Sequence, residues 1–217
     1  MPSTTLEEYL ETIYKLAIEG TVRPTQIAEA MGVSGPTVTA TLKRLEAHGL
    51  IVREGTAVVL TEEGVARSVE IVRKHRIAER FLVDILGLDW EAAHQDACLL
   101  EHALSPRVLE ALEAYLGDPT VCPHGHPIPA ADGSVAATAG EPLDRVEPGF
   151  SATVLRVAED EALLRYLGEV GLRPGARVHV VALEPFGGPL TVRIDDSNRA
   201  LARDVARFVI VGDVAPT

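Results

Sequence analysis

Apolar residues recur at helical spacing through the first half of the chain. Leu6, Leu10, Ile13 and Ala17 fall three or four positions apart, which predicts a helix over residues 6–19. The same periodicity predicts helices over residues 24–31, 34–48, 62–86, 90–104 and 106–116, with glycine or proline near most of their ends. Between the third and fourth of these helices, residues 50–60 are expected to form two short strands around Glu54-Gly55.

The pattern changes beyond Asp118. Residues 119–148 are rich in proline and glycine and have no helical period, which predicts a linker or an extended loop. From Phe150 to Val214, short apolar runs alternate with turns, as is typical of five or six short strands in a small β-barrel. We therefore expect an α+β protein of one to three small domains.

Two short helices joined by Gly32-Val33-Ser34 and followed by a strand pair are typical of a winged helix-turn-helix, which binds DNA. The second helix begins with small and hydroxyl residues that can approach base edges and phosphates. The DNA-binding candidates are Ser34, Pro36, Thr37, Thr39, Lys43 and Arg44, together with Thr5 near the N-terminus. No arginine stands at the front of this helix, so methyl contacts and DNA shape are expected to matter more than guanine recognition. A helix-turn-helix used only for protein contacts is the alternative.

The charge of the chain is in tension with DNA binding. The sequence has 20 basic and 32 acidic residues, for a formal net charge of -12, whereas DNA-binding domains usually carry a basic patch. Between residues 34 and 53, however, Lys43, Arg44 and Arg53 outnumber the single acidic Glu46, so this region is locally positive. Bound divalent cations would relieve part of the repulsion from DNA. An acidic enzyme would have the same composition.

The chain is expected to be cytoplasmic, with no membrane partner. It has no stretch of 18 uncharged apolar residues, and its first ten residues lack the basic-then-apolar pattern of a signal peptide. Its two cysteines, Cys98 and Cys122, are too few for a disulfide framework and suit a reducing compartment.

Potential metal ligands gather on two neighbouring predicted helices. They are His94, Cys98, Glu101 and His102 on the helix over residues 90–104, and His75 and Glu79 on the preceding helix. At about 100° per residue, the first four fall within an arc of about 120° on one helix face. Six such groups predict one or two metal sites. Nitrogen and oxygen ligands suit Mn(II) or Fe(II), while a thiolate favours softer ions.

Other interpretations of these side chains stay open. Cys98 and His102 lie one helical turn apart and could form a catalytic pair, although no oxyanion-hole loop or nucleophile elbow accompanies them. A metal-storage or chaperone protein is a third class. Cys122, His124 and His126 are spaced too tightly for a closed tetrahedral zinc site, and we expect a structured loop there.

Taken together, these segments resemble the diphtheria-toxin-repressor family, which includes iron-dependent regulators and manganese transport regulators. The resemblance covers the whole chain. It is carried by residues 8–14 (EYLETIY), 27–29 (IAE), 34–38 (SGPTV), 60–64 (LTEEG), 73–79 (RKHRIAE), 101–105 (EHALS) and 122–129 (CPHGHPIP). The segment GLRPG at residues 171–175 resembles the SH3-like barrel of the longer members.

The resemblance implies three domains and a function. Residues 1–64 would form the winged helix-turn-helix domain, residues 65–140 a helical metal-binding and dimerisation domain with a proline-rich linker, and residues 141–217 an SH3-like (FeoA-like) domain. The protein would be a homodimeric repressor of metal-homeostasis genes, not an enzyme, that binds palindromic operator DNA when loaded with metal. The recognition helices of the dimer would lie about 34 Å apart, one turn of DNA.

The resemblance also implies two metal sites per subunit. One would use His75, Glu79 and His94, with Glu159 of the barrel domain. The other would use Glu8, Cys98, Glu101 and His102, with Glu11 as a further candidate.

The family comparison also bears on which metal binds. In the iron regulators a methionine stands at the position of Glu8, whereas the manganese regulators have a carboxylate there and at Glu11, but a glutamate in place of Cys98. The hard ligand at Glu8 favours Mn(II), with Fe(II) as the alternative. Glu8 and Glu11 also lie opposite the apolar stripe of the first helix, so a solvated helix face is the other interpretation of both. Ala40 replaces a glutamine of the family's recognition helix, so the operator preference is expected to differ.

Overall fold

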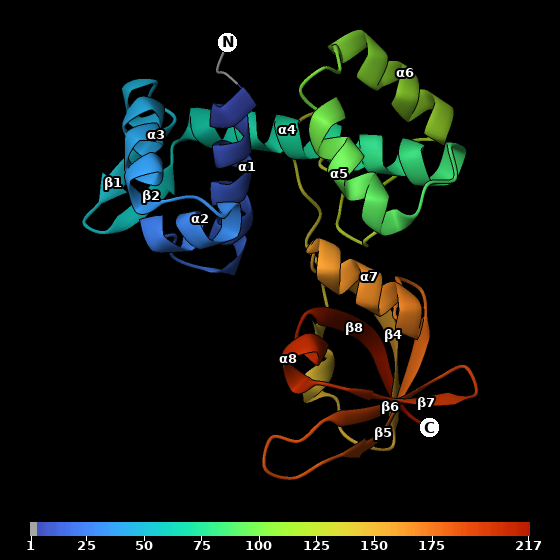
Figure 1. Cartoon of the computed structure of the whole chain (residues 1–217). Helices are drawn as coiled ribbons and strands as arrows, with labels where there is room; N and C mark the ends of the chain where they lie inside the picture. The colour runs from blue at the N-terminus through green and yellow to red at the C-terminus, as the bar shows by residue number, and fades with distance from the viewer. Residues whose placement is uncertain (1–3) are drawn as a thin grey trace. The chain divides into compact units, whose positions relative to one another are not determined.

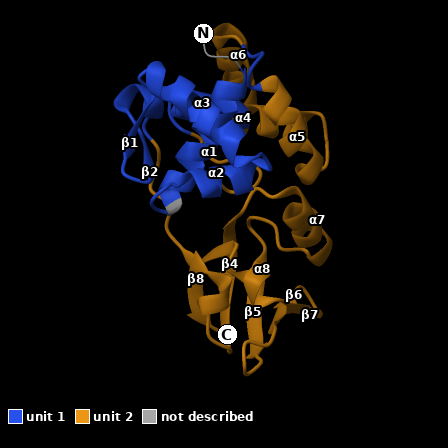
Figure 2. Cartoon of the chain, turned by 60° about the vertical axis from the view of Figure 1, so that its left-hand side comes forward, with its two compact units in different colours: residues 1–75, 101–104, 129–134 blue, residues 76–100, 105–128, 135–217 orange. Residues whose placement is uncertain are grey.

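The computed structural model describes residues 4–217, with the exception of the side chain of Glu19. By its internal contacts the chain divides into two compact units, shown in different colours in Figure 2. Unit 1 contains the chain up to His75 and the segments 101–104 and 129–134. Unit 2 contains residues 76–100, 105–128 and 135–217.

Unit 1 is built from helices and a β-hairpin (Figure 1). Its elements are α1 (Thr4–Glu19), α2 (Pro24–Met31), α3 (Gly35–Ala47), β1 (Ile51–Glu54), β2 (Ala57–Leu60) and the first part of α4 (Glu62–Arg80). The apolar stripe predicted for the first helix is fully buried at Leu6, Leu10 and Ile13, where it packs in one core with Ile27 of α2 and Leu42 of α3. The structure confirms the winged helix-turn-helix predicted from the sequence.

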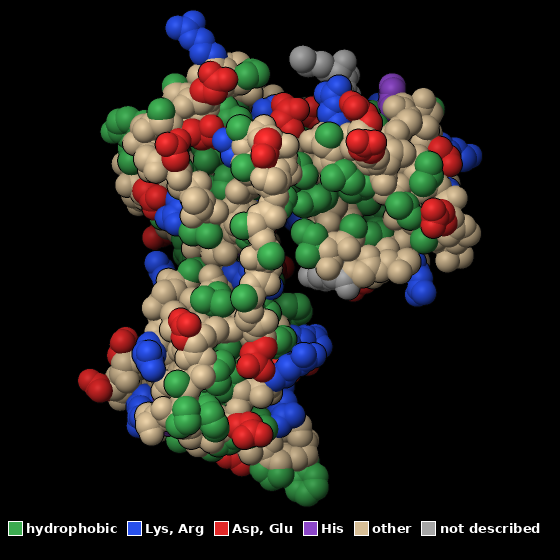
Figure 3. Space-filling model, turned by 180° about the vertical axis from the view of Figure 1, so that it is seen from behind, with side chains coloured by type: hydrophobic (Ala, Val, Ile, Leu, Met, Phe, Trp, Pro, Cys, Tyr) green, Lys and Arg blue, Asp and Glu red, His purple; other side chains and the backbone are tan. Residues whose placement is uncertain are grey.

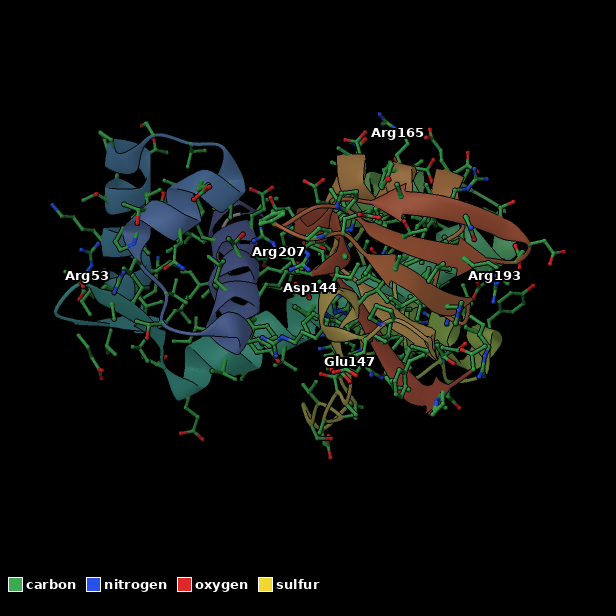
Figure 4. All side chains as sticks on the ribbon, turned by 90° about the horizontal axis from the view of Figure 1, so that it is seen from below. Arg53, Asp144, Glu147, Arg165, Arg193 and Arg207 are labelled. Atoms are coloured by element: carbon green, nitrogen blue, oxygen red, sulfur yellow. The ribbon has the colours of Figure 1, made fainter. Side chains whose placement is uncertain are left out.

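The ends of the elements in the winged helix-turn-helix have clear local causes. Gly32 adopts a left-handed conformation (φ 63°) that ends α2. Ser34 then caps α3, because its hydroxyl accepts a hydrogen bond from the backbone N–H of Thr37. In the wing, β1 and β2 pair antiparallel with Ile51 opposite Leu60, and Arg53 lies exposed on this hairpin (Figure 4).

The helical part of unit 2 differs from the sequence prediction at one important place. The end of α4 continues as a π-helix, η1 (Phe81–Ile85), and is followed by α5 (Trp90–Leu100) and α6 (Pro106–Leu116). The prediction that the helix beginning at Trp90 extends to Leu104 is wrong, because α5 ends at Leu100 and the next three residues form a turn. Pro106 disfavours a helical conformation for Ser105, and Ser105 caps α6 instead.

The remainder of unit 2 is an antiparallel sheet with small helices. Its elements are β3 (Glu141–Pro142), η2 (Leu143–Arg145), β4 (Phe150–Val157), α7 (Glu161–Val170), β5 (Arg177–Leu183), β6 (Leu190–Ile194), β7 (Ser197–Leu201), α8 (Arg203–Ala206) and β8 (Val209–Pro216). The strand order is β3-β8-β4-β5-β6-β7, so the described strands form an open sheet rather than the closed barrel expected. The arrangement still fits an SH3-like domain.

One apolar core joins this sheet to the helices of unit 2. Leu164 and Leu167 of α7 are fully buried in the same cluster as Val178 and Val192 of the sheet. Trp90, the first residue of α5, belongs to this core as well, so the N-terminus of α5 is anchored on the sheet domain.

The surface is mixed in charge. On the face shown in Figure 3, acidic and basic side chains are interspersed over the molecule. Within residues 4–217, no helix combines the length and the apolar character that crossing a bilayer requires.

Candidate metal centres

Unit 2 contains a compact group of potential metal ligands, which we call the unit 2 cluster: Glu79, Cys122, His124 and Glu159. One ligand atom from each of these residues lies within 4.8 Å of all the others. Glu79 stands in the last turn of α4, Cys122 and His124 in the loop after α6, and Glu159 two residues after the end of β4. Glu79 and His124 are fully buried, and Cys122 is nearly so. Three separate segments therefore converge on one small volume.

A tight turn shapes the loop that carries two of these ligands. The N–H of Gly125 donates to the carbonyl of Cys122, and the N–H of Cys122 donates to the carbonyl of His126. The N–H of Val157 donates to the carbonyl of His124, which docks the loop on β4. Gly125 has φ 87°, and a Cβ there would lie 1.9 Å from the carbonyl oxygen of Leu155. Only glycine fits this close approach of two backbones.

Hydrogen bonds fix the orientation of His124. Its Nε2 lies 3.0 Å from the carbonyl oxygen of Trp90, which can only accept, so Nε2 carries a proton. In the neutral ring the lone pair then resides on Nδ1, which lies 3.2 Å from a carboxylate oxygen of Glu79. The Trp90 ring packs against the imidazole of His124, with 5.3 Å between the two ring centroids. His124 thus directs a metal-binding nitrogen into the cluster.

Two further histidines border the unit 2 cluster. Nδ1 of His94 on α5 lies 2.8 Å from a carboxylate oxygen of Glu79. Nε2 of His126 lies 2.8 Å from the carbonyl oxygen of Val157 and 3.9 Å from a carboxylate oxygen of Glu159. His94 was a sequence-predicted ligand, and the structure places it beside Glu79.

The electrostatics of this cluster suit a cation. Burial raises the pKa of the Cys122 thiol well above its usual range, and the charges of Glu79 and Glu159 raise it further. Burial alone would lower the pKa of His124, but the hydrogen bond and charge of Glu79 and the charge of Glu159 raise it overall. Buried acidic groups this close together disfavour one another's ionisation, and a divalent cation would reverse that penalty. The residues present therefore fit a metal ion.

Unit 1 contains a second group, which we call the unit 1 cluster: Glu11, His75, Glu101 and His102. Ligand atoms of Glu11 on α1, His75 on α4 and Glu101 in the turn after α5 lie within 4.8 Å of one another. Nδ1 of His75 lies 2.7 Å from one carboxylate oxygen of Glu101, and Nε2 of His102 lies 3.3 Å from the other. Glu11, His75 and Glu101 are all buried.

Burial also perturbs the acid at the centre of the unit 1 cluster. Burial raises the pKa of Glu101, and the negative charge of Glu11 raises it further, while His75 and His102 oppose these effects. Lys15 lies 3.1 Å from a carboxylate oxygen of Glu11. A set of two buried carboxylates and two imidazoles fits a divalent cation with nitrogen and oxygen preference.

The early end of α5 changes the geometry assumed from the sequence. With Glu101 and His102 in a turn, the four ligands predicted on one helix face do not share a helix, and Cys98 and His102 are not separated by one helical turn. Glu101 and His102 belong to unit 1, whereas His94 and Cys98 remain on α5 in unit 2. Cys98 is partly buried there.

The other predicted ligands lie as follows. Glu159 joins the unit 2 cluster and Glu11 the unit 1 cluster, whereas the side chain of Glu8 is exposed. Sequence reasoning missed Cys122 and His124 as ligands, because their spacing is too tight for a site made by the loop alone. The available signal was a thiol and an imidazole two residues apart in a Pro/Gly turn, which other segments can complete.

The predicted DNA-binding residues share an exposed location. Ser34, Pro36, Thr37, Thr39, Lys43 and Arg44 lie at the start or on the outer side of α3, and Thr5 lies in the first turn of α1; all seven are exposed. The opposite side of α3 is buried at Val38, Leu42 and Leu45. The helix therefore presents the candidate side chains to solvent while its apolar face holds it in unit 1.

The fold and the clusters together indicate a DNA-binding protein that responds to divalent metal. Residues 1–57 match the N-terminal DNA-binding domain of iron-dependent repressors, residues 61–130 match the metal-binding and dimerisation domain of these repressors, and residues 141–212 match the FeoA domain. The chain belongs to the iron-dependent, or diphtheria-toxin-repressor, family of metal-dependent transcriptional repressors, which are not enzymes.

Individual relatives span the whole chain. The chain is 39% identical over 225 residues to the iron-dependent repressor IdeR of Mycobacterium leprae, covering 97% of each. Among solved structures, it is similar to a manganese-dependent transcriptional repressor in complex with manganese, with a TM-score of 0.87 and 35% identity over 95% of this chain and 98% of that one. It is also similar to the manganese regulator SloR, with a TM-score of 0.82 and 30% identity over 95% and 97% of the two chains.

Proposed function

We propose that this protein is a cytoplasmic, Mn(II)-activated repressor that binds palindromic operator DNA as a homodimer and controls genes of metal-ion homeostasis. The observation that carries the proposal is the unit 1 cluster, in which Glu11 of α1 meets His75 and Glu101. Because α1 packs in one core with α2 and α3, a restraint on Glu11 also restrains the recognition helix.

The chain's own residues provide the coupling. Glu11 is buried although it is acidic, and Lys15 is its one-turn neighbour at 3.1 Å. A bound divalent cation would supply the positive charge that lets Glu11, Glu101 and the imidazole of His75 converge. When the cation holds Glu11, α1 keeps α3 in the one orientation that fits the major groove. Metal and operator then strengthen each other's binding, with a coupling of roughly 1–3 kcal/mol as a typical scale.

The ligand chemistry supports Mn(II) as the activating ion. The unit 1 cluster has only carboxylate and imidazole donors, which suit Mn(II) and Fe(II) better than soft ions. The unit 2 cluster adds the Cys122 thiol, which shifts that site toward softer ions. Fe(II) activation is the second candidate, because curated relatives such as IdeR are iron-dependent repressors.

Operator binding tests the proposal directly. DNA ligands are selected from a random-sequence pool with the full chain and Mn(II), and their affinities are then measured with Mn(II), with Fe(II) under anaerobic conditions, with Ca(II) and with chelator. We expect palindromic ligands that bind a dimer with Mn(II) and are released by chelator. Equal affinity with and without chelator would contradict metal activation, and tighter binding with Fe(II) than with Mn(II) would support the alternative.

A further inference from the structure

Glu7, a residue that neither the sequence nor the family resemblance indicates as functional, contacts the unit 1 cluster. Its carboxylate oxygen Oε2 lies 2.6 Å from Nδ1 of His102, which makes this a short, charge-assisted hydrogen bond. The Glu7 side chain is 27% exposed and that of His102 is 11% exposed, so solvent screens the contact only in part. The two residues come from the first turns of α1 and from the turn after α5.

The two nitrogens of His102 face different carboxylates. Nδ1 faces Glu7, while Nε2 lies 3.3 Å from Oε1 of Glu101. Glu101 is in turn bound through its other oxygen to His75. His102 is therefore a bridge between Glu7 on the outside and the buried carboxylate at the centre of the cluster.

The neighbouring residue Glu8 does not take part in this arrangement. The structure directs Glu7 toward His102 and leaves Glu8 exposed. Glu7 also stands one helical turn before Glu11, so both face the same side of α1.

We propose that Glu7 is the positioning carboxylate of the unit 1 metal site and that it acts through His102. Glu7 accepts the Nδ1–H hydrogen bond, which leaves the Nε2 lone pair free beside Glu101 for a cation. Histidine ligands of metals commonly donate their other N–H to a carboxylate, which fixes the ring and raises its basicity. This inference rests on the proposed function, since it specifies how the same site communicates with α1.

The position of Glu7 gives this contact a second consequence. Glu11 attaches the middle of α1 to the cluster, and Glu7 attaches its first turns, so two points one turn apart define the orientation of the helix. A single attachment would leave α1 free to pivot about Glu11. The Glu7–His102 pair therefore transmits occupation of the unit 1 site to the N-terminal end of the DNA-binding unit.

Metal binding by matched variants tests the proposal. Glu7→Gln is compared in the full chain with its control Glu62→Gln, by titrating Mn(II) and counting free Mn(II) by electron paramagnetic resonance. Glu62 is an exposed glutamate in the first turn of α4, outside both clusters. Trp90 is the only tryptophan and lies beside His124, so its fluorescence reports the unit 2 cluster separately. We expect Glu7→Gln to weaken the unit 1 site by about 10–100-fold, the typical effect of losing such a partner. The Trp90 response of Glu7→Gln and both sites of Glu62→Gln should be unchanged.

A spectroscopic signature separates positioning from a merely structural role. In metal-free protein at a pH where imidazoles are neutral, ¹⁵N correlation spectra should show His102 with its proton on Nδ1. In Glu7→Ala this tautomer preference should be lost, while Glu62→Ala should retain it. If Glu7→Ala fails to fold, the isosteric Glu7→Gln still carries the affinity test.

Several results would overturn the inference. These are a unit 1 affinity of Glu7→Gln equal to that of the wild-type chain, an unchanged His102 tautomer in Glu7→Ala, or a wild-type chain that binds metal only in unit 2. If the proposed function were wrong, operator binding would not depend on metal. That result would not change the metal affinities of the variants or the His102 tautomer, so the two failures can be told apart.

Discussion

Nδ1 of His124 lies 3.2 Å from a carboxylate oxygen of Glu79, and neither side chain is exposed to solvent. This contact joins the last turn of α4 to a loop that follows α6. It also brings the imidazole next to Trp90, whose ring centroid is 5.3 Å from that of His124. The unit 2 cluster therefore lies directly beside a natural fluorophore, the indole of Trp90.

Trp90 fluorescence should report metal binding to the unit 2 cluster. Mn(II) is paramagnetic, and a cation held by His124 would quench an indole at this distance. We expect saturable quenching by Mn(II) in the wild-type chain and none in His124→Ala. His179→Ala is the control, because His179 on β5 contacts Ser151 and Thr217 and lies outside both clusters. Quenching that persists in His124→Ala would show that His124 is not a ligand of the site that Trp90 reports.

The thiol of Cys122 should set the selectivity of the unit 2 cluster. Replacing sulfur by the harder hydroxyl in Cys122→Ser should weaken Zn(II) binding much more than Mn(II) binding, because thiolates favour softer ions. The ratio of the two dissociation constants checks this. Mn(II) is titrated directly by Trp90 quenching, and diamagnetic Zn(II) is titrated against bound Mn(II) and followed by the recovery of Trp90 fluorescence. The same ratio in Cys98→Ser tells the two thiols apart: a larger change in Cys98→Ser would show that Cys98, not Cys122, is the softer ligand.

Gly125 should be essential for assembling the unit 2 cluster. In Gly125→Ala the new Cβ would lie 1.9 Å from the carbonyl oxygen of Leu155, and the loop carrying Cys122 and His124 would have to leave β4. We expect a loss of stability of about 1–3 kcal/mol and the disappearance of metal-dependent Trp90 quenching.

Gly133→Ala is a matched control for this substitution. Gly133 has nearly the same backbone angle, φ 82° against 87°, but its nearest neighbour to a new Cβ lies at 3.9 Å. Gly133→Ala would therefore have the same backbone strain as Gly125→Ala but no clash of the new Cβ with a neighbouring residue. Thermal unfolding should therefore show a small loss for Gly133→Ala, with Trp90 quenching retained. Equal behaviour of the two variants would mean that the approach to Leu155 does not position the loop.

Much of the fold could be predicted because it follows from local rules. The stripe of Leu6, Leu10 and Ile13 specified α1 and its buried face, and Ser34 with the following proline marked the start of α3. These signals depend only on residues within a few turns of one another.

The arrangement of the ligands depended on contacts between distant segments. Glu101 lies in the turn after α5 and has its partners in His75 and His102, which the periodicity of the sequence does not reveal. In the same way, Cys122 and His124 form a site only when Glu79 and Glu159 arrive from α4 and β4. The spacing of Cys122 and His124 excluded a metal site made by their loop alone. It could not exclude a site to which other segments of the chain add ligands.

Ser34 should matter for both the stability and the DNA binding of the recognition helix. Its hydroxyl caps α3 by accepting from the N–H of Thr37, and it lies 2.8 Å from the Thr37 hydroxyl. Ser34→Ala should cost about 1 kcal/mol of stability, the usual value of an N-cap. It should also weaken operator binding in the presence of Mn(II), because an exposed hydroxyl at the helix N-terminus and the orientation of Thr37 are lost together.

Ser105 offers a matched control for these two effects. It caps α6 in the same way, because its hydroxyl accepts a hydrogen bond from the N–H of Val108 at 3.4 Å. Both helices also have a proline in their first turn, Pro106 in α6 and Pro36 in α3. Ser105→Ala should therefore lower stability by a similar amount while operator affinity stays at the wild-type value. Chemical denaturation and operator titration on both variants separate the contributions. If the two variants lose operator affinity equally, the effect of Ser34 comes from helix stability and not from contact with DNA.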